Sequence, residues 1–256
     1  MTTSLAVAPV DAGPIVWSTP TGGTVTSSPA VADGLVYVGS GDSWLYALSA
    51  DTGLLAWKTL TGGSVDSSPA IANGIVYVGA DDGRVYATAA ATGQIVWVTQ
   101  TGGPADSLPV VVNGVVYVGS DDFGLYAMDA VTGQILWKTG TEDPIDSSPA
   151  VANGVVYVGS DDGDLYALNA ATGQILWKTL TFGAVDSSPT VVNGVVYVGS
   201  DVGTLFALDA VTGQILWQTS TLGDIDSSPA IFNGVGYVGS DDAFLYALNA
   251  ATGQIL

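Results

Sequence analysis

Three features of the sequence predict an all-β fold, a β-propeller of six four-stranded antiparallel blades. Each 40-residue unit contains four short runs rich in Val, Ile, Leu and Tyr, separated by turn residues. No segment has a 3.6-residue apolar period long enough for a helix. The unit recurs without insertion in the frames 17–56, 57–96, 97–136, 137–176, 177–216 and 217–256. Because a ring of sheets packed face to face buries surfaces that one small sheet cannot, residues 1–256 are expected to form a single domain.

Three residue series keep the 40-residue spacing along the chain. The tyrosines are Tyr37, Tyr77, Tyr117, Tyr157, Tyr197 and Tyr237. The prolines are Pro29, Pro69, Pro109, Pro149, Pro189 and Pro229. The tryptophans are Trp17, Trp57, Trp97, Trp137, Trp177 and Trp217. Since no series slips, each blade is expected to repeat the geometry of the blade before it.

The elements follow a fixed order, which the fourth unit illustrates. Strands are expected at 147–151, 155–160, 164–169 and 174–179. Asn-Gly joins the first two, because both residues tolerate the positive φ of a tight hairpin. Asp-Asp-Gly forms the next turn, helped by aspartate bonds to nearby amides. The proline before the first strand fits an edge strand lining a central channel, where a missing N–H breaks no ladder bond.

The charge balance excludes several functions. Twenty-four acidic residues give a net charge of −20 against only four cations, Lys58, Arg84, Lys138 and Lys178. Such a surface repels phosphate, which disfavours nucleic acids and anionic membranes as partners. The acidic residues also serve as turn formers and keep an apolar chain soluble.

The missing residue types exclude further chemistry. With no cysteine and no histidine, the chain has no disulfide, thiol nucleophile, histidine-based triad, or thiolate or imidazole metal site. No apolar run approaches the length of a membrane span. The first 13 residues have neither a basic residue nor a long apolar core, so no signal peptide is visible and the compartment stays open.

One sequence motif of the repeat resembles the motif of a known protein family. The pattern Ala-x-(Asp/Asn)-x-x-Thr-Gly-x-x-x-Trp occurs at 127–137 and 167–177. It resembles the tryptophan-docking motif of the quinoprotein, or PQQ-like, propeller repeat, and the resemblance covers essentially the whole chain. The resemblance implies that each tryptophan of the series above stacks on a neighbouring blade at a turn such as Thr132–Gly133. The third motif position departs to Ser49 and Ala89, so looser docking is expected in the first two blades.

The two chain ends predict how the ring closes. Joining Leu256 to Trp17 continues the repeat in register, so we expect the N-terminal segment 1–20 to complete the last blade. Residues 14–16 and 254–256 then compete for the same places. The resemblance implies more blades, commonly eight, so six either close a tighter ring or leave an opening filled through oligomerisation. We favour the closed monomer; an oligomer formed through unpaired terminal strands is the alternative.

The resemblance also implies a quinone pocket with cationic partners and a calcium site with a catalytic aspartate. This chain has only four cations and lacks the cysteine pair of many members, so we predict no catalytic residue, no cofactor and no enzyme. A ring of carboxylates remains as a candidate calcium site, although capping of the local turns explains the same residues. Its members are Asp66, Asp106, Asp146, Asp186 and Asp226.

Differences between the units predict a contact surface. The Asn-Gly and Thr-Gly turns barely vary, whereas the loops after the second strand and between blades vary and lie together on the opposite face. Aromatic and arginine side chains typify protein contacts. The candidate partner-binding residues are Trp44, Arg84, Phe123, Phe182, Leu222 and Phe244. We therefore predict a scaffold that binds a protein or peptide. The alternatives are an engineered or recently amplified repeat protein with a purely structural role, and a relative of PQQ-dependent dehydrogenases.

Overall fold

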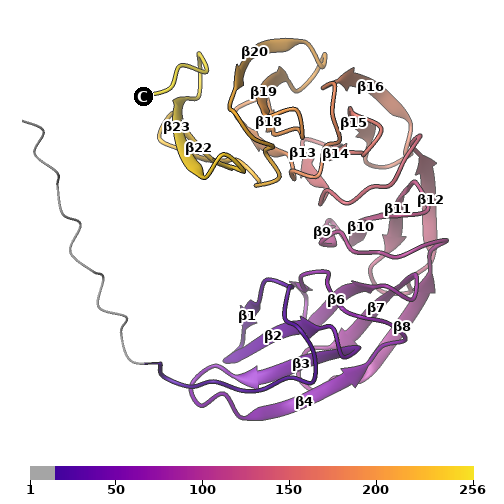
Figure 1. Ribbon diagram of the computed structural model, residues 1–256. Coiled ribbons are helices and arrows are strands. Elements are labelled where there is room, and N and C mark those ends of the chain that lie inside the picture. Colours follow the sequence, from indigo (N-terminus) through magenta and orange to yellow (C-terminus); the bar gives the residue numbers. More distant parts are fainter. Residues whose placement is uncertain (1–14) are drawn as a thin grey trace, which may run out of the picture.

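The computed structural model describes residues 15–256, which form six antiparallel sheets arranged one after another around a common axis (Figure 1). The predicted all-β propeller of six blades is confirmed. Consecutive strands pair within each sheet, and each sheet is one blade. No helix within this described range has the length and apolar character to cross a membrane.

The blades are numbered 1 to 6 in chain order. Blade 1 contains β1 (Ala30–Ala32), β2 (Leu35–Ser40), β3 (Trp44–Ser49) and β4 (Leu55–Leu60). Blade 2 contains β5 (Ala70–Ala72), β6 (Ile75–Ala80), β7 (Arg84–Ala89) and β8 (Ile95–Gln100). Blade 3 contains β9 (Val110–Val112), β10 (Val115–Ser120), β11 (Gly124–Asp129) and β12 (Ile135–Gly140).

The second half of the chain repeats the pattern. Blade 4 contains β13 (Ala150–Ala152), β14 (Val155–Gly159), β15 (Asp164–Asn169) and β16 (Ile175–Leu180). Blade 5 contains β17 (Thr190–Val192), β18 (Val195–Val198), β19 (Thr204–Asp209) and β20 (Ile215–Ser220). Blade 6 contains β21 (Ala230–Phe232), β22 (Val235–Ser240) and β23 (Phe244–Asn249).

The first strand of each blade lies nearest the axis and the fourth lies at the rim (Figure 1). Blade 3 shows the local chemistry. Asn113 and Gly114 join β9 to β10 with φ of 52° and 79°, the positive values expected of an Asn-Gly hairpin turn. Between β11 and β12 the register shifts at Ala127/Met128. This bulge lets the outer strand follow the blade's twist.

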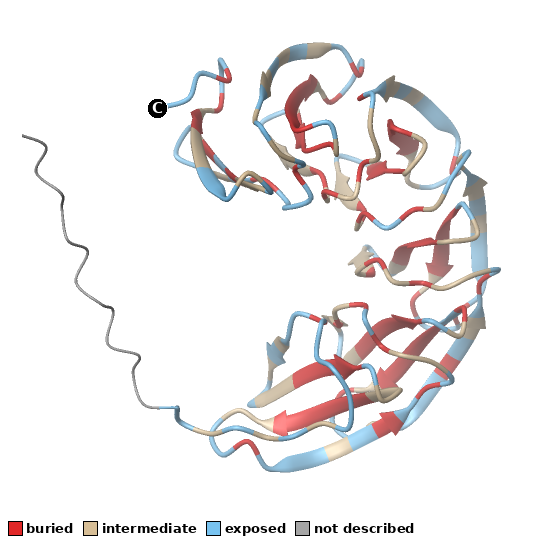
Figure 2. Cartoon of the chain, viewed as in Figure 1, coloured by how far each residue is buried: buried red, intermediate tan, exposed pale blue. Residues whose placement is uncertain are grey.

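The core lies between blades rather than inside any one of them. Tyr117 and Leu125 of blade 3 pack against Ile145, Val156 and Val158 from blade 4 and the loop that leads into it. The middle strands are accordingly buried while the rim strands are largely exposed (Figure 2). Each interface repeats the previous one, so five similar apolar layers hold the six blades together.

The predicted closure of the ring is wrong for this structure. Blade 6 does not reach blade 1, and the arc is open between them (Figure 1). Leu245 is 76% exposed, whereas the residues at its position in the five earlier blades are at most 1% exposed. Val25, which precedes blade 1, is 52% exposed, whereas all five of its counterparts are fully buried. Each terminal blade therefore lacks a neighbour on one face.

The two competing terminal segments lie in different places. Ile255 forms a bridge with Leu248, and the Leu256 N–H donates to the Ala247 carbonyl at 2.9 Å, so the C-terminal residues begin a fourth strand of blade 6. Ile15 and Val16 are more than 80% exposed. The prediction for segment 1–20 falls largely on residues 1–14, outside the described residues. The described remainder, 15–20, contacts blade 1.

Candidate functional site

The tryptophan of each outer strand makes the same contact with the next blade, called here the docking contact. Trp137 Nε1 donates to the Ala170 carbonyl at 3.0 Å, and Tyr117 Oη donates to the same oxygen at 3.1 Å. Thr139 Oγ1 donates to the Gly173 carbonyl at 2.7 Å. Gly173 adopts φ of 71°, and a Cβ there would lie 2.7 Å from the Trp137 ring, so only glycine fits.

The predicted looser docking of the first two blades is not seen. Trp17 and Trp57 donate to their alanine carbonyls at 2.9 Å, as closely as the later tryptophans do. The third motif position instead stabilises its own turn. The Asp129 carboxylate accepts from the Thr132 N–H at 2.8 Å, whereas Ser49 accepts from the corresponding N–H at 3.3 Å.

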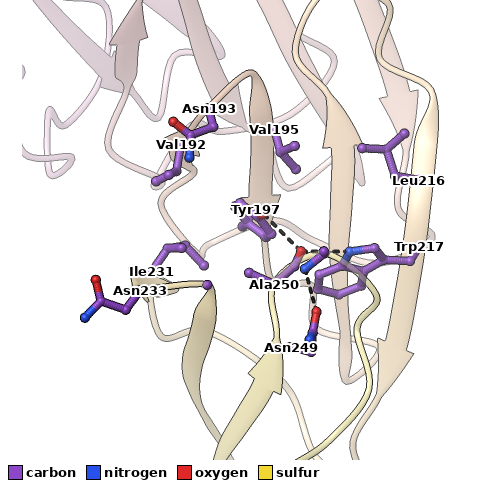
Figure 3. A pocket seen from close by; sticks show the side chains of 12 residues that line it. Val192, Asn193, Val195, Tyr197, Leu216, Trp217, Ile231, Asn233, Asn249 and Ala250 are labelled. Carbon is purple, nitrogen blue, oxygen red and sulfur yellow. Dashed lines mark hydrogen bonds between the residues drawn. The ribbon is translucent and has the colours of Figure 1, made fainter.

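A cavity of about 720 Å³ lies beside the docking contact between blades 5 and 6 (Figure 3). Val195, Leu216, Ile231 and neighbouring residues line it. The Trp217 and Tyr197 donors at its base both bond the Ala250 carbonyl, as the dashed lines show (Figure 3). A similar cavity of about 610 Å³ lies between blades 3 and 4. Because these donors are already used, the cavities are crevices of the blade interface and not a built ligand site.

The variable loops share one face, called here the loop face. The Thr61 N–H donates to the Ser43 carbonyl at 2.9 Å, which joins a blade-to-blade loop to a loop after a second strand. On the opposite side, the Ala50 N–H donates to the Gly34 carbonyl at 2.9 Å, which joins the two uniform turns. This side is called the turn face.

An aspartate anchors the loop face in five of the six blades. In blade 3, Asp122 Oδ2 accepts from Tyr126 Oη, from the Gly102 N–H at 2.8 Å and from Lys138 Nζ at 2.8 Å. These bonds tie the incoming loop to the blade. Although burial acts to raise it, the pKa of Asp122 is lowered by Lys138 and Tyr126.

The predicted carboxylate ring is a series of carboxylate pairs. Asp106 lies beside Asp81, and burial followed by the charge of Asp81 raises the pKa of Asp106 to about 7. Burial and Asp146 raise the pKa of Asp121 to about 6. Asp106 and Asp121 each keep a buried oxygen without a hydrogen-bond donor among the described residues. When one carboxyl of a pair holds a proton, its O–H can donate to the other carboxylate, and the repulsion between two negative charges is removed.

The pairs continue along the arc toward blade 6. Burial, Asp146 and Asp186 raise the pKa of Asp161 to about 7. Burial, Asp186 and Asp226 raise the pKa of Asp201 to about 6. Sequence reasoning missed this second series. Its signal was available, because the first residue of each Asp-Asp or Asp-Val turn repeats every 40 residues. In blade 1 that position is Gly41, so Asp66 lacks a carboxylate opposite it; its Oδ1 accepts from Thr26 Oγ1 at 2.7 Å.

The residues present do not fit the quinone or the calcium ion of the quinoprotein dehydrogenases. Within residues 15–256, no three or more acidic side chains lie together in an arrangement that could hold a metal ion. The cations are engaged elsewhere: Lys58 Nζ lies 4.0 Å from the Trp44 ring centre, and Lys178 pairs with Asp164 at 2.7 Å. An anionic quinone needs free cations, and the loop face offers mainly carboxylates.

The structure spreads the six candidate partner-binding residues along the arc. Trp44 and Arg84 begin the third strands of blades 1 and 2, and Arg84 pairs with Asp82 at 3.0 Å. Phe123 is 42% exposed on blade 3. Phe182, Leu222 and Phe244 lie toward the C-terminal end and are 70%, 93% and 64% exposed.

Comparison with known proteins agrees with the architecture. The family model described as outer membrane protein assembly factor BamB matches residues 4–108, 82–182 and 181–256. No curated protein sequence matches the chain. The crystal structure of BamB from Moraxella catarrhalis superposes with a TM-score of 0.80 at 20% identity, covering 90% of this chain and 74% of that one.

Two further solved structures share the fold. The computationally designed protein Ika8 gives a TM-score of 0.82 at 22% identity, covering 91% of this chain and 73% of that one. The quinohemoprotein alcohol dehydrogenase ADHIIG from Pseudomonas putida HK5 gives 0.74 at 17% identity, covering 89% of this chain and 57% of that one. At these identities the likeness concerns the fold alone. The family matches extend from residue 4 to residue 256, and the chain therefore belongs to the family of the outer membrane protein assembly factor BamB.

Proposed function

We propose that the chain is a non-enzymatic scaffold that binds a protein or peptide through its loop face. The observation that carries the proposal is the exposure of large apolar side chains on the variable loops of blades 5 and 6. Leu222 is 93% exposed, Phe182 70% and Phe244 64%. Apolar side chains gathered on one face are typical of protein contact surfaces.

Local geometry brings these side chains into two neighbouring groups. The Leu222 and Phe244 N–H groups donate to the two oxygens of the same carboxylate, Asp242, at 3.1 and 3.0 Å. The residue after Phe182, Gly183, packs so closely on Val202 that a Cβ on the glycine would lie 2.8 Å from Val202 Cγ1. Val202 is itself 49% exposed. We call Phe182, Val202, Leu222 and Phe244 the apolar loop patch.

Backbone strain supports a role for Phe182. Its φ is 70°, a left-handed value that is uncommon for a bulky side chain. The glycines at the same position of the first three units, Gly22, Gly62 and Gly102, do not adopt positive φ. Strain of this kind tends to be kept at functional sites. Trp44 and Arg84 are less available to a partner, because Lys58 and Asp82 already contact them.

The chemistry of the face suggests the partner. Apolar anchors within a chain of net charge −20 suit a segment with apolar and basic side chains. The absence of cysteine and histidine removes thiol nucleophiles and imidazole acid–base groups. The family's description as an assembly factor supports a role in protein assembly.

Selection from a displayed library of random peptides tests the proposal. We expect the full-length chain to enrich peptides with apolar and basic residues. Their affinity should fall at least tenfold, or ~1.4 kcal/mol, when Phe182→Ser and Leu222→Ser are combined. Leu54→Ser is the matched control, since Leu54 is 71% exposed beside the Thr-Gly turn of blade 1, on the turn face.

Two outcomes contradict the proposal. Peptides that lose affinity equally with Leu54→Ser would place binding elsewhere. A selection that enriches no peptide would favour the second candidate, a purely structural repeat protein, which the near-identical docking contacts support.

A further inference from the structure

Each end of the arc holds an incomplete blade. At the N-terminal end, Trp17 Nε1 donates to the Ala50 carbonyl at 2.9 Å, and Thr19 Oγ1 donates to the Gly53 carbonyl at 2.5 Å. Trp57 and Thr59 of β4 contact blade 2 at the same two distances. Residues 17–19 therefore hold the place of an outer strand beside blade 1, and residues 15–256 form no further strand of that sheet. At the C-terminal end, β21–β23 form a blade whose fourth strand stops at Ile255 and Leu256.

The hydrogen bonds at the two ends are complementary. In all five blade interfaces, one alanine carbonyl accepts from both a tryptophan and a tyrosine of the preceding blade, as Ala170 does from Trp137 and Tyr117. Within the described residues, Ala50 accepts from Trp17 alone. Tyr237 is 39% exposed, and its Oη has no acceptor there. One end lacks the donor and the other lacks the acceptor.

The apolar faces are complementary in the same sense. Leu245 projects from blade 6 at the position that meets the next blade in every complete interface, and Val25 marks the receiving position before blade 1. At the first complete interface, Leu45 packs with Val65 and Val76 in one buried cluster. The open faces are thus the two halves of a contact that the chain makes five times.

The curvature sets how many blades fit between these faces. The chain superposes on BamB and on Ika8 with TM-scores of 0.80 and 0.82 while covering 74% and 73% of their lengths. The unmatched part of each of those chains is about 80 to 90 residues long, which corresponds to two further repeats of 40 residues. A second complete copy brings six blades, which is more than this difference allows.

We infer that the opening is a docking site for two consecutive 40-residue repeats of this same type. The first residues of this two-repeat segment continue the outer strand that Ile255 and Leu256 begin. The last three strands of the segment pair with residues 15–20, which serve as their outer strand. Strand addition at both ends supplies main-chain hydrogen bonds, and the apolar faces supply the buried area. This inference is independent of the apolar loop patch.

A polypeptide spanning residues 137–214 is the probe, because it contains two repeats and omits the two positions that Ile15 and Val16 already fill. We expect it to form a 1:1 complex with the full chain, seen by native mass spectrometry, and to raise the chain's Tm. A one-repeat polypeptide, 137–174, can cover only one of the two open faces. It should bind the full chain at least tenfold more weakly than the two-repeat polypeptide does.

A fused chain guards against a probe that does not fold alone. Residues 137–214 appended after Leu256 should give a protein whose Tm exceeds that of the original chain, with the larger gain on adding the second repeat rather than the first. In the two-chain experiment, Leu245→Asp should abolish the complex while leaving the Tm of the free chain within a degree or two. Leu222→Asp, at a leucine that is 93% exposed but on the loop face, should leave the complex intact.

Three results would overturn the inference. The first is the absence both of a complex and of any Tm gain in the fused chain. The second is a free chain that is already dimeric, which would make a second copy the occupant. The third is a free monomer in which the Leu245 amide is as protected from hydrogen exchange as the Leu205 amide, which would mean that the chain closes on itself.

Discussion

Blade 5 replaces two side chains that act together in every other blade. Elsewhere an aspartate of the loop after the second strand accepts a hydrogen bond from a tyrosine four residues later, as Asp162 does from Tyr166 at 2.7 Å. In blade 5 these positions are Val202 and Phe206. Phe206 is 1% exposed, so a hydroxyl there would need a partner that valine cannot provide. The paired change keeps the interior free of an unsatisfied polar group.

Restoring the tyrosine of this pair without the aspartate should lower the free energy of unfolding. Phe206→Tyr buries a hydroxyl without its acceptor and should reduce the free energy of unfolding by ~1–3 kcal/mol. Adding Val202→Asp should recover most of that loss, because the carboxylate accepts from the new phenol. Urea unfolding of the two single variants and the double variant measures the coupling. Additive effects, with no recovery in the double variant, would contradict the assignment.

The outer strand and the turn it contacts form the element on which the blade interfaces depend. Gly133 and Gly154 both adopt positive φ, of 72° and 78°. A Cβ on Gly133 would lie 2.6 Å from the Trp97 ring, whereas a Cβ on Gly154 would meet nothing within 4 Å. The two glycines thus share a backbone demand, but only Gly133 is packed against a neighbouring blade.

Alanine at these two glycines separates strain from packing. Gly154→Ala should cost ~1–2 kcal/mol, since only the left-handed backbone is penalised. Gly133→Ala should cost a further ~1–3 kcal/mol, because the methyl group displaces the indole. Chemical denaturation with tryptophan fluorescence as the probe measures both. Equal losses would mean that the docking contact contributes little at this turn.

Sequence reasoning succeeds at this scale where a local rule applies. The Asn-Gly dipeptide predicts the positive φ of Asn113. The resemblance to the tryptophan-docking motif implies that each tryptophan packs on a Thr-Gly turn of a neighbouring blade, as Trp137 does at Gly173. The pairing of Asp81 with Asp106 escaped prediction, because the two carboxylates belong to different blades and each has a local explanation as a turn residue. Proximity of this kind depends on how neighbouring blades pack.

At the scale of the whole molecule, the carboxylate pairs make stability depend on pH in an unusual direction. Folding raises the pKa of Asp106 and Asp161 to about 7, from ~3.9 for an unfolded aspartate. The folded state therefore binds protons more tightly, so this stabilisation is fully present below pH ~4 and is lost as pH rises through 7. Groups such as Asp122, whose pKa is lowered, act in the opposite sense only at more acidic pH.

The Tm should accordingly fall by several degrees between pH 4.5 and pH 8. Asp106→Asn combined with Asp161→Asn should flatten this dependence and raise the Tm at pH 8, because amides carry no charge to repel the neighbouring carboxylates. Asp51→Asn is the matched control, since Asp51 is exposed in the Thr-Gly turn of blade 1, on the opposite face from the carboxylate pairs. Scanning calorimetry at several pH values provides the measurement. A Tm that rises steadily to pH 8 in the original chain would refute the assignment.

The sequence predicts six blades but not whether they close a ring. Blade number follows from counting repeats such as those marked by Tyr37 and Tyr237. The angle between blades depends on the bulk of side chains such as Leu125 and Val156, which pack across the interface. Small changes in that packing accumulate over five interfaces, so a repeat pattern alone cannot distinguish a closed circle from an open arc.

The uniform contact between blades has a consequence for how such chains change over generations. A gene that gains or loses one 40-residue unit still encodes matching surfaces at every joint, because each joint uses the same tryptophan, tyrosine and glycine. We therefore expect duplication or deletion of a unit to leave the remaining joints intact wherever in the array it occurs. The number of units then decides whether the circle is left with free ends.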